Sequence, residues 1–162
     1  DYPNQIWVSD ITCFKLNTKY FYTCIILDLF SRKIVAYRIS KKNSTQLVSA
    51  TFRQAYDVRS PKDGLIFHSD RGVQYASYSF RRLLSEHGVI QSFSASGKPH
   101  DNAVVEAFFA SMKREELYRR SYSSEKAFRS GVDEYISFYN KRRPHFSLNY
   151  KSPEQFEAVA AK

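Results

Sequence analysis

The first forty residues alternate apolar and polar side chains in a way that predicts three β-strands. The segment "QIWVSDITCF" (5–14) places Val8 and Asp10 on one face, and a period of two is typical of a strand. Two more extended segments, "YFYTCIILDLF" (20–30) and "IVAYRIS" (34–40), follow after short polar turns. Because strands joined by such short turns pair antiparallel, we expect an antiparallel meander.

The rest of the chain alternates between helical and extended patterns. Apolar spacing predicts helices over 44–58, 78–88, 101–116 and 124–142, a last short helix from Pro153, and strands over 65–68 and 89–93. Ser44 and Asp101 are candidate N-caps, and Gly88 is a candidate helix stop. Since strands that alternate with helices usually pair in parallel, we predict an α/β layout.

The composition is that of one globular domain with an uneven positive charge. Of 162 residues, 43% are hydrophobic and 25% are charged, and no apolar run approaches the ~20 residues that span a bilayer. The formal charge is +9, and residues 11–62 hold ten Lys or Arg against Asp28 and Asp57. This bias favours a polyanionic partner, although a basic surface without a specific partner would look the same. An anionic membrane is disfavoured, because no segment combines an apolar face with a basic one.

Two cysteines, Cys13 and Cys24, lie in strands predicted to be adjacent. Cross-strand proximity would permit a disulfide, but the chain opens on polar residues rather than on a secretory signal. Two cysteines in that context usually stay reduced, so we expect free thiols in a reducing cytoplasm. The sequence contains no CxxC pair or His/Cys cluster that would indicate zinc.

Three acidic residues occupy positions that the surrounding apolar pattern disfavours. Asp10 shares the face of Val8 in the first strand. Asp70 follows the strand 65–68, at the end where α/β sheets commonly bind ligands. Glu106 lies between two apolar pairs in "VVEAFF". If the first and fourth strands are neighbours, and the helix that carries Glu106 packs across them, the three carboxylates converge.

A cluster of carboxylates near an apolar core is unfavourable unless a cation neutralises it. Oxygen ligands without His or Cys favour Mg²⁺ or Mn²⁺, and two such ions about 3.5–4 Å apart support in-line displacement at phosphorus. A basic protein with such a site is a candidate for phosphoryl chemistry on nucleic acid. Each acid taken singly could instead be a cap, a salt-bridge member or a turn residue, which is how we interpret Asp28 in "LDLFSRK".

The spacing of the three acids, with the motifs around them, resembles one family. Asp10 lies in "WVSDIT", Asp70 in "HSDRGVQY" and Glu106 in "DNAVVEAFFASMKRE", with 35 residues between the last two, and "YISFYNKRRPHFSLNYKSPEQF" follows near the end of the chain. Over residues 4–156 the chain resembles the catalytic core of bacterial insertion-sequence transposases of the Asp, Asp, 35-residue gap, Glu (DDE) type. These are relatives of retroviral integrases within the ribonuclease-H-like superfamily.

This resemblance implies a fold, a reaction and a cofactor. The fold is α/β and ribonuclease-H-like, with a five-stranded mixed sheet, its first three strands antiparallel, and helices on both faces. The reaction is cleavage at transposon ends and joining of the released 3′-OH to DNA, without a covalent protein–DNA intermediate. Asp10, Asp70 and Glu106 match the family's catalytic metal ligands, which hold two Mg²⁺ (or Mn²⁺) ions.

The resemblance also implies DNA contacts around the three acids. Lys113 follows Glu106 by seven residues, which is nearly two helical turns or about 10.5 Å along the axis, so it shares the same helix face. The other candidates for DNA contact are Asn102, Arg71, Gln74, Tyr75, Lys98, Arg142 and Arg143. The basic run 141–143 could equally cap a helix end. His68 is interpreted as a packed strand-end residue rather than a metal ligand, and the loop 94–100 is expected to order when DNA binds.

The resemblance bears on the extent of the protein as well. Family members usually carry an N-terminal helix-turn-helix region, and nothing of that kind precedes Asp1. We therefore predict that 1–162 is an integrase catalytic core domain from a longer, nucleoid-associated bacterial transposase. A dimer or larger assembly on DNA is expected, because two element ends must be brought together, and no membrane partner is expected. Two alternatives stay open: a related nuclease that only hydrolyses, and an inactive remnant that binds DNA.

Overall fold

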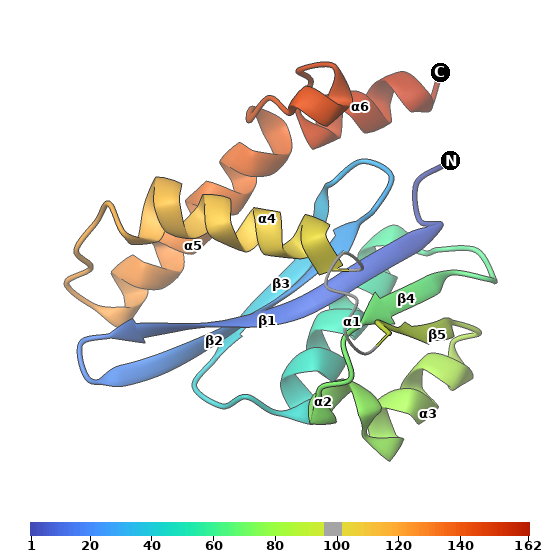
Figure 1. Ribbon diagram of the computed structural model, residues 1–162, viewed down its shortest axis with the longest axis horizontal. Coiled ribbons are helices and arrows are strands. Elements are labelled where there is room, and N and C mark those ends of the chain that lie inside the picture. Colours follow the sequence, from blue (N-terminus) through green and yellow to red (C-terminus); the bar gives the residue numbers. More distant parts are fainter. Residues whose placement is uncertain (96–101) are drawn as a thin grey trace.

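A mixed sheet of five strands organises the computed structural model, which describes residues 1–95 and 102–162 (Figure 1). The strands are β1 (Ile6–Leu16), β2 (Lys19–Asp28), β3 (Ile34–Ser40), β4 (Ile66–Ser69) and β5 (Ile90–Phe93). Their order across the sheet is β3-β2-β1-β4-β5. Pairing is antiparallel from β1 through β3, and β4 pairs in parallel with both β1 and β5. This confirms the predicted mixed sheet and its antiparallel first three strands.

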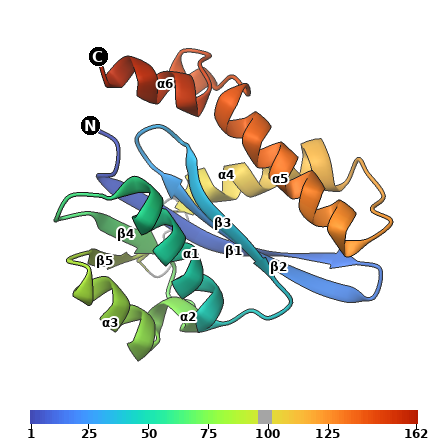
Figure 2. The same ribbon diagram turned by 180° about the vertical axis from the view of Figure 1, so that it is seen from behind.

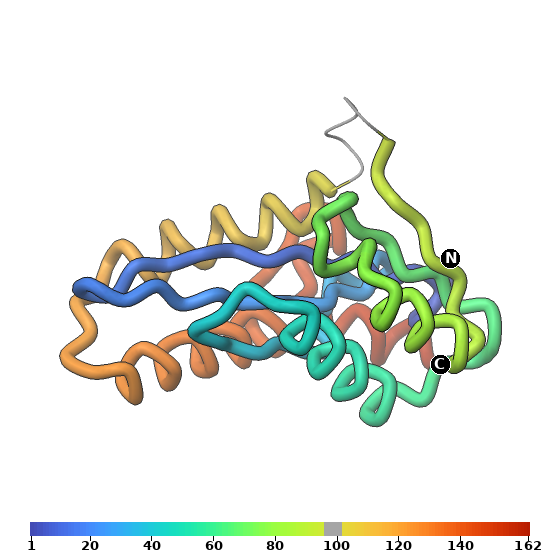
Figure 3. Tube along the Cα trace, turned by 90° about the horizontal axis from the view of Figure 1, so that it is seen from below, coloured from blue at the N-terminus to red at the C-terminus, as the bar shows by residue number. Residues whose placement is uncertain are grey.

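Helices cover both faces of this sheet, as predicted. The helices are α1 (Thr45–Arg59), α2 (Val73–Ala76), α3 (Tyr78–Glu86), α4 (Ala103–Met112), α5 (Glu125–Lys141) and α6 (Pro153–Ala160), with a π-helical turn η2 (Lys113–Leu117) and a 3-10 turn η3 (Phe146–Leu148). Seen edge-on, α1 and α4 lie on opposite sides of the sheet (Figure 3). From behind, α1, α2 and α3 lie in front of it (Figure 2).

Each face of the sheet has its own apolar core, because consecutive strand residues point to opposite faces. Trp7 and Ile26 pack with side chains of α1, α2 and α3, whereas Val8 and Ile25 pack with α4 and α5. The central strands are therefore buried on both faces, which makes them a firm base for a site at their ends. Asp10, two residues beyond Val8, belongs to the face that α4 covers.

A buried ion-pair network closes the end of the sheet near the N-terminus. Asp28 is fully buried and accepts hydrogen bonds from the backbone N–H groups of Asn4 (2.7 Å) and Phe30 (3.0 Å). The Arg59 guanidinium donates to Asp28 at 2.9 Å and to Glu157 at 2.7 Å. The network ties β2, the end of α1 and α6 together, and it confirms the interpretation of Asp28 as a structural acid.

The helix predicted over 101–116 changes its geometry before it ends. The α-helical part stops at Met112 and continues as the π-helical turn η2. Within that turn Glu116 is buried, and it accepts a hydrogen bond from the Tyr122 hydroxyl at 2.7 Å. A side chain at Gly131 would place its Cβ 2.8 Å from the Tyr122 ring, so the glycine makes room for this pair. An inserted π-turn of this kind often lies near a functional site.

Surface charge and the cysteines follow the sequence only in part. Three of the ten cations in residues 11–62 form ion pairs, Lys33 with Glu154, Lys41 with Glu125, and Arg59 as described. Part of the positive charge of residues 11–62 is thus neutralised by ion pairs within the fold.

Cys13 is exposed and Cys24 is buried, and both are free thiols, as expected. Among the described residues, no helix has the length and apolar character needed to cross a bilayer.

Candidate active site

The parallel register of β1 and β4 brings two of the predicted acids level with each other. Ile6 pairs with Ile66 and Val8 pairs with His68. The same register continued by two residues sets Asp10 of β1 beside Asp70, which directly follows β4. The carboxyl end of β4 is where ligand sites of α/β sheets lie. The pairing of two strands far apart in sequence is therefore what brings Asp10 and Asp70 together.

Asp70 is held by the turn that follows it. One carboxylate oxygen, Oδ1, accepts the backbone N–H of Gly72 at 2.8 Å. A Cβ at position 72 would lie 3.0 Å from this oxygen and 3.1 Å from Gln74 Oε1, so a glycine allows the close approach. The other oxygen, Oδ2, has no hydrogen bond to a described residue and remains available to a ligand. Asp70 is thus both a turn residue and a candidate ligand.

Glu106 lies in the first turn of α4. The sequence suggested a charge within the buried face of this helix, but that interpretation is wrong, because Glu106 is exposed while Val105 and Phe108 are buried. The helix turns Glu106 outward, next to the apolar stripe rather than within it. Its position in the first turn is also favourable for a carboxylate, since the N-terminal end of a helix carries partial positive charge.

The three carboxylates influence one another electrostatically. Burial is the largest cause that raises the pKa of Asp10 from its ordinary value of 3.8 to about 6, and the negative charges of Asp70 and Glu106 raise it further. The Ile11 N–H, 2.8 Å from Asp10 Oδ1, acts in the opposite direction. None of the three acids forms a salt bridge with a Lys, Arg or His of the described residues. Within residues 1–95 and 102–162, the site is therefore an acidic cluster that no cationic side chain neutralises through an ion pair.

This chemistry fits a hard divalent cation, because the available donors are carboxylate oxygens. In residues 1–95 and 102–162, however, no three His, Cys, Asp or Glu side chains lie close enough together to enclose one metal ion. The three acids thus form an open set, close enough to share an electric field but not drawn into one coordination shell. His68 does not complete this set, since its ring nitrogens lie 2.9 Å and 3.1 Å from the hydroxyls of Ser92 and Ser94. This agrees with its interpretation as a packed residue.

The raised pKa of Asp10 gives a test of this electrostatic cluster without DNA. A carboxyl whose pKa is higher in the folded than in the unfolded state destabilises the fold as pH rises from about 4 to about 6, and the full cost remains above that range. With EDTA present, Asp10→Asn should therefore raise the free energy of unfolding at pH 7 by about 1–3 kcal/mol. The gain should vanish as the pH approaches 4. Urea titrations from pH 4 to pH 8 measure this.

The matched control for that titration is Asp57→Asn, which removes an exposed carboxylate of α1. Its stability should change by less than about 0.5 kcal/mol at every pH. An equal gain at pH 4 and pH 7 for Asp10→Asn would contradict the electrostatic origin, because a protonated aspartic acid carries no repulsion.

Tyr75 is a core residue, which corrects its prediction as a DNA contact. Its side chain is buried, with the hydroxyl 2.9 Å from Ser9 Oγ. Ser9 also donates to the Ile25 carbonyl at 2.7 Å, and the Cys24 thiol lies 3.9 Å from the Tyr75 hydroxyl. Ser9 is the neighbour of Asp10 in β1, so these polar groups lie on the opposite face of that strand. Sequence reasoning missed this cluster, although a serine on the apolar Trp7 face was a signal that a buried partner must exist.

The remaining residues predicted to contact DNA differ in their exposure and in whether other side chains already bind them. Arg71 is exposed, with its guanidinium 5.8 Å from the Phe93 ring, and Gln74 donates to Asn43 at 2.7 Å. Lys113 is half-buried at the start of η2 and forms no ion pair within the described part of the chain. Arg71 and Lys113 therefore keep charges that are available to a ligand.

Three further candidates lie at helix ends. Asn102 precedes α4, and Arg142 and Arg143 follow α5. Asn102 is the N-cap residue of α4, and its buried Oδ1 has no hydrogen-bond partner among the described residues. Arg142 is exposed near the Phe138 ring, whereas Arg143 donates two hydrogen bonds to Glu115, at 2.9 and 2.7 Å. Arg143 is thus largely engaged within the fold. Lys98, the candidate cap Asp101 and most of the loop 94–100 lie outside the described residues.

Comparison with known proteins identifies the family of the chain and proteins of the same fold. Two family models, both described as "Integrase core domain", match residues 1–99 and 87–153. The transposase for insertion sequence element IS904 of Lactococcus lactis is 36% identical over 96% of the chain, and transposase InsF for insertion sequence IS3A of Escherichia coli is also 36% identical over 96%. The chain spans 62% and 54% of the length of these two relatives.

Solved structures with the same fold are more distant in sequence. The HTLV-2 integrase catalytic core domain in complex with magnesium superposes with a TM-score of 0.78 at 18% identity, covering 96% of this chain and 97% of that one. A chain of the simian T-cell lymphotropic virus intasome in complex with PP2A regulatory subunit B56 gamma superposes with a TM-score of 0.81, also at 18% identity, covering 96% of this chain and 55% of that one. The ribonuclease-H-like fold that the sequence predicted is thereby confirmed.

Proposed function

Because the chain belongs to the integrase core domain family, we propose that it is the catalytic core of an insertion-sequence transposase, a DDE-type polynucleotidyl transferase that cuts and joins DNA. The observation that carries the proposal is the β1–β4 register, which sets Asp10 beside Asp70, with Glu106 in the first turn of α4 near enough for its charge to raise the pKa of Asp10. Three acids without an ion-pair partner among the described residues repel one another, which is unfavourable for a fold alone. The same arrangement is useful for holding metal ions against phosphate.

Asp10, Asp70 and Glu106 are the residues that would hold divalent cations, two Mg²⁺ or Mn²⁺ in our proposal. Bound there, such ions would stabilise the charge that develops at phosphorus and lower the pKa of an attacking hydroxyl. The protein contributes fixed geometry. Asp10 is set by the β1–β4 pairing, and Gly72 orients one oxygen of Asp70, which leaves the other free. Glu106 lies exposed in the first turn of α4.

The proposed reaction has two phosphoryl-transfer steps, and in each step one P–O bond forms as another breaks. In the first, water attacks a phosphodiester at an element end, which breaks the bond to the 3′ oxygen and releases a 3′-OH. In the second, that hydroxyl attacks a phosphodiester of another DNA segment, forming one P–O bond as one is broken. No side chain becomes covalently attached, so the carboxylates serve throughout as ligands rather than as nucleophiles. Two ends must be held together for this, and we propose a dimer or larger assembly on DNA.

Lys113, like Arg71, is a proposed DNA contact that forms no ion pair among the described residues. It follows Glu106 by seven residues and has no acidic partner within the described part of the chain. A hydrogen bond from a charged donor to a phosphate typically contributes about 1.5–3 kcal/mol. We therefore expect Lys113→Gln to lower strand-transfer rate at subsaturating DNA by about tenfold or more. Lys126→Gln, which neutralises an exposed lysine of α5, should leave it unchanged, and equal effects of the two would exclude a specific role for Lys113.

The experiment that tests the function is a strand-transfer assay with the protein, labelled element-end DNA, a target plasmid, and Mg²⁺ or Mn²⁺. Labelled ends joined to the target support the proposal. Cut ends that are never joined would identify a nuclease that only hydrolyses. DNA binding without cutting or joining would identify an inactive DNA-binding remnant.

A further inference from the structure

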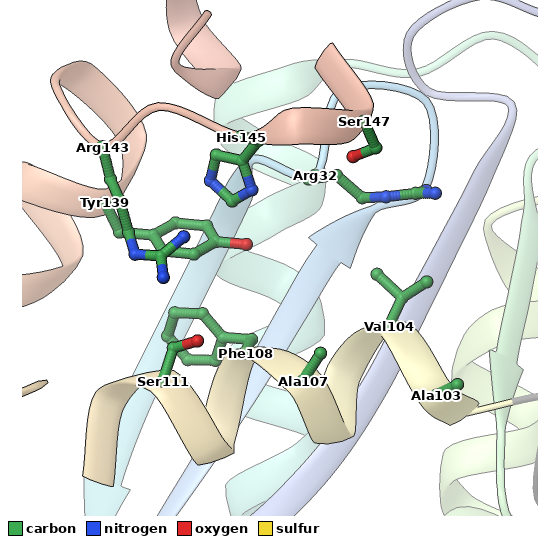
Figure 4. Close-up of a pocket in the computed structure, with 10 residues that line it drawn as sticks. All are labelled: Arg32, Ala103, Val104, Ala107, Phe108, Ser111, Tyr139, Arg143, His145 and Ser147. Carbon is green, nitrogen blue, oxygen red and sulfur yellow. The ribbon is translucent and has the colours of Figure 1, made fainter. Parts of the chain in front are cut away.

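A cavity of about 280 Å³ lies beside α4, between that helix and the end of α5 with the segment that follows it. Ala103, Val104, Ala107 and Ser111 line it from α4, with His145 and Ser147 across from them (Figure 4). Phe108 and Tyr139 form its inner wall, and Arg32 and Arg143 approach it from the β2–β3 turn and the end of α5. None of these residues belongs to the acidic cluster.

The cavity has more positive than negative charge. Arg143 is balanced by Glu115, which accepts two of its N–H groups. Arg32 forms no salt bridge within the described residues and donates only to the Leu29 carbonyl of its own turn. Both arginines are close enough to His145 to lower its pKa, which burial has already lowered, to about 4. The histidine is therefore neutral at pH 7, and the positive charge of Arg32 has no ion-pair partner among the described residues.

The conformation of Arg32 points to a role for its side chain. Its φ of +65° lies in the left-handed region, where glycine or asparagine fits without strain. The turn itself needs only the Arg32 backbone N–H, which donates to the Asp28 carbonyl at 2.7 Å. An arginine therefore adds strain to this turn, while its guanidinium is directed to the cavity wall.

Several polar groups in the cavity have unused hydrogen-bonding capacity. His145 Nε2 is buried and has no partner among the described residues. The Tyr139 hydroxyl and the hydroxyls of Ser111 and Ser147 likewise make no hydrogen bond within that part of the chain. A buried polar atom without a partner is costly. The Arg32 guanidinium, a neutral imidazole N–H and three hydroxyls together are donors suited to the oxygens of a phosphate.

We propose that this cavity binds one phosphate of the DNA backbone, with the attached sugar against the apolar side chains of Ala107 and Phe108. The inference deepens the proposed function and rests on it for the identity of the ligand. Glu106 does not line the cavity, so the phosphate bound there is a different one from the phosphate at the acids.

The test compares Arg32→Gln with Arg53→Gln, an exposed arginine of α1 on the opposite side of the sheet. DNA affinity is measured by fluorescence anisotropy from 50 to 300 mM salt, in the Glu106→Gln background so that turnover does not interfere. Arg32→Gln should weaken binding about tenfold for any DNA sequence and reduce the slope of log affinity against log salt by about 1. Arg53→Gln should change neither, and thermal melting checks that both variants fold.

A second measurement reads the cavity directly. Binding of inorganic phosphate near His145 should favour the imidazolium, so NMR titration of the His145 ring should show its pKa raised by about one unit or more in phosphate buffer. Equal DNA affinities of the Arg32 and Arg53 variants would overturn the proposal. So would a phosphate effect on His145 with unchanged DNA affinity, because an adventitious ion would then be the ligand. An Arg32 effect without strand transfer by the parent protein would refute the proposed function and leave the phosphate site standing.

Discussion

Replacing Glu106 with glutamine should abolish strand transfer while the fold stays intact. Glutamine keeps the length and shape of the side chain but removes the negative charge that would hold a cation beside Asp10 and Asp70. Transition-state stabilisation by a bound metal is worth several kcal/mol, so we expect a loss of at least about 10³-fold in rate. Asp10→Asn and Asp70→Asn should behave in the same way, because the three acids act as one unit and their losses are not additive.

The control is Glu134→Gln, which neutralises an exposed acid of α5 away from the sheet ends. Its rate should match that of the parent protein in the assay with joined plasmid products. Circular dichroism and DNA affinity should be unchanged for all four variants, which separates a chemical defect from a folding or binding defect. Strand transfer retained in any of the three acid variants would refute the catalytic assignment.

Arg59→Met should produce a large loss of stability. Methionine fills a similar volume but leaves Asp28, which is 0% exposed, buried without a cation. Removing one partner of a buried ion pair typically costs about 3–5 kcal/mol. The Asp28 carboxylate would keep its two backbone N–H donors, Asn4 and Phe30, so we expect the lower half of that range. Urea denaturation at pH 7 measures the loss.

Arg53→Met, in the same helix but exposed, provides the matched control and should change stability by less than about 0.5 kcal/mol. The double variant Arg59→Met with Asp28→Asn should recover part of the loss, because a neutral amide is less costly to bury than an unpaired carboxylate. A loss for Arg59→Met no greater than that for Arg53→Met would show that the network contributes nothing to the fold.

Local patterns were sufficient wherever the structure depends on near neighbours. The period of two in residues 5–14 placed Val8 and Asp10 on one face, and both lie on the side that α4 covers. Ser44 was predicted to cap a helix, and its hydroxyl accepts the Leu47 N–H at 3.3 Å. Signals of this kind depend on alternation and on capping within three or four residues. They do not depend on where the rest of the chain lies.

The errors arose where distant segments decide the environment of a residue. Tyr75 looked like a surface residue after "SDRGVQ", but its hydroxyl is taken by Ser9, 66 positions away. Glu106 looked buried because its sequence neighbours are apolar. The rotation of α4 against the sheet turns it outward instead. The π-turn after Met112 depends on the contacts of Glu116 with Tyr122 and of Tyr122 with Gly131, which no helical pattern predicts.

The amino-acid order alone was enough to identify the strands and the family, and it singled out the acids at 10, 70 and 106 as the candidate site. It could do so because covalent spacing and side-chain period are properties of the chain itself. Whether those acids share one electric field was decided by the β1–β4 register and by the packing of α4. The cavity beside α4 is likewise lined by both Arg32 and His145, which are 113 positions apart in the sequence. Electrostatic interactions fall off with distance in space rather than in sequence, so only the folded arrangement could bring such groups together.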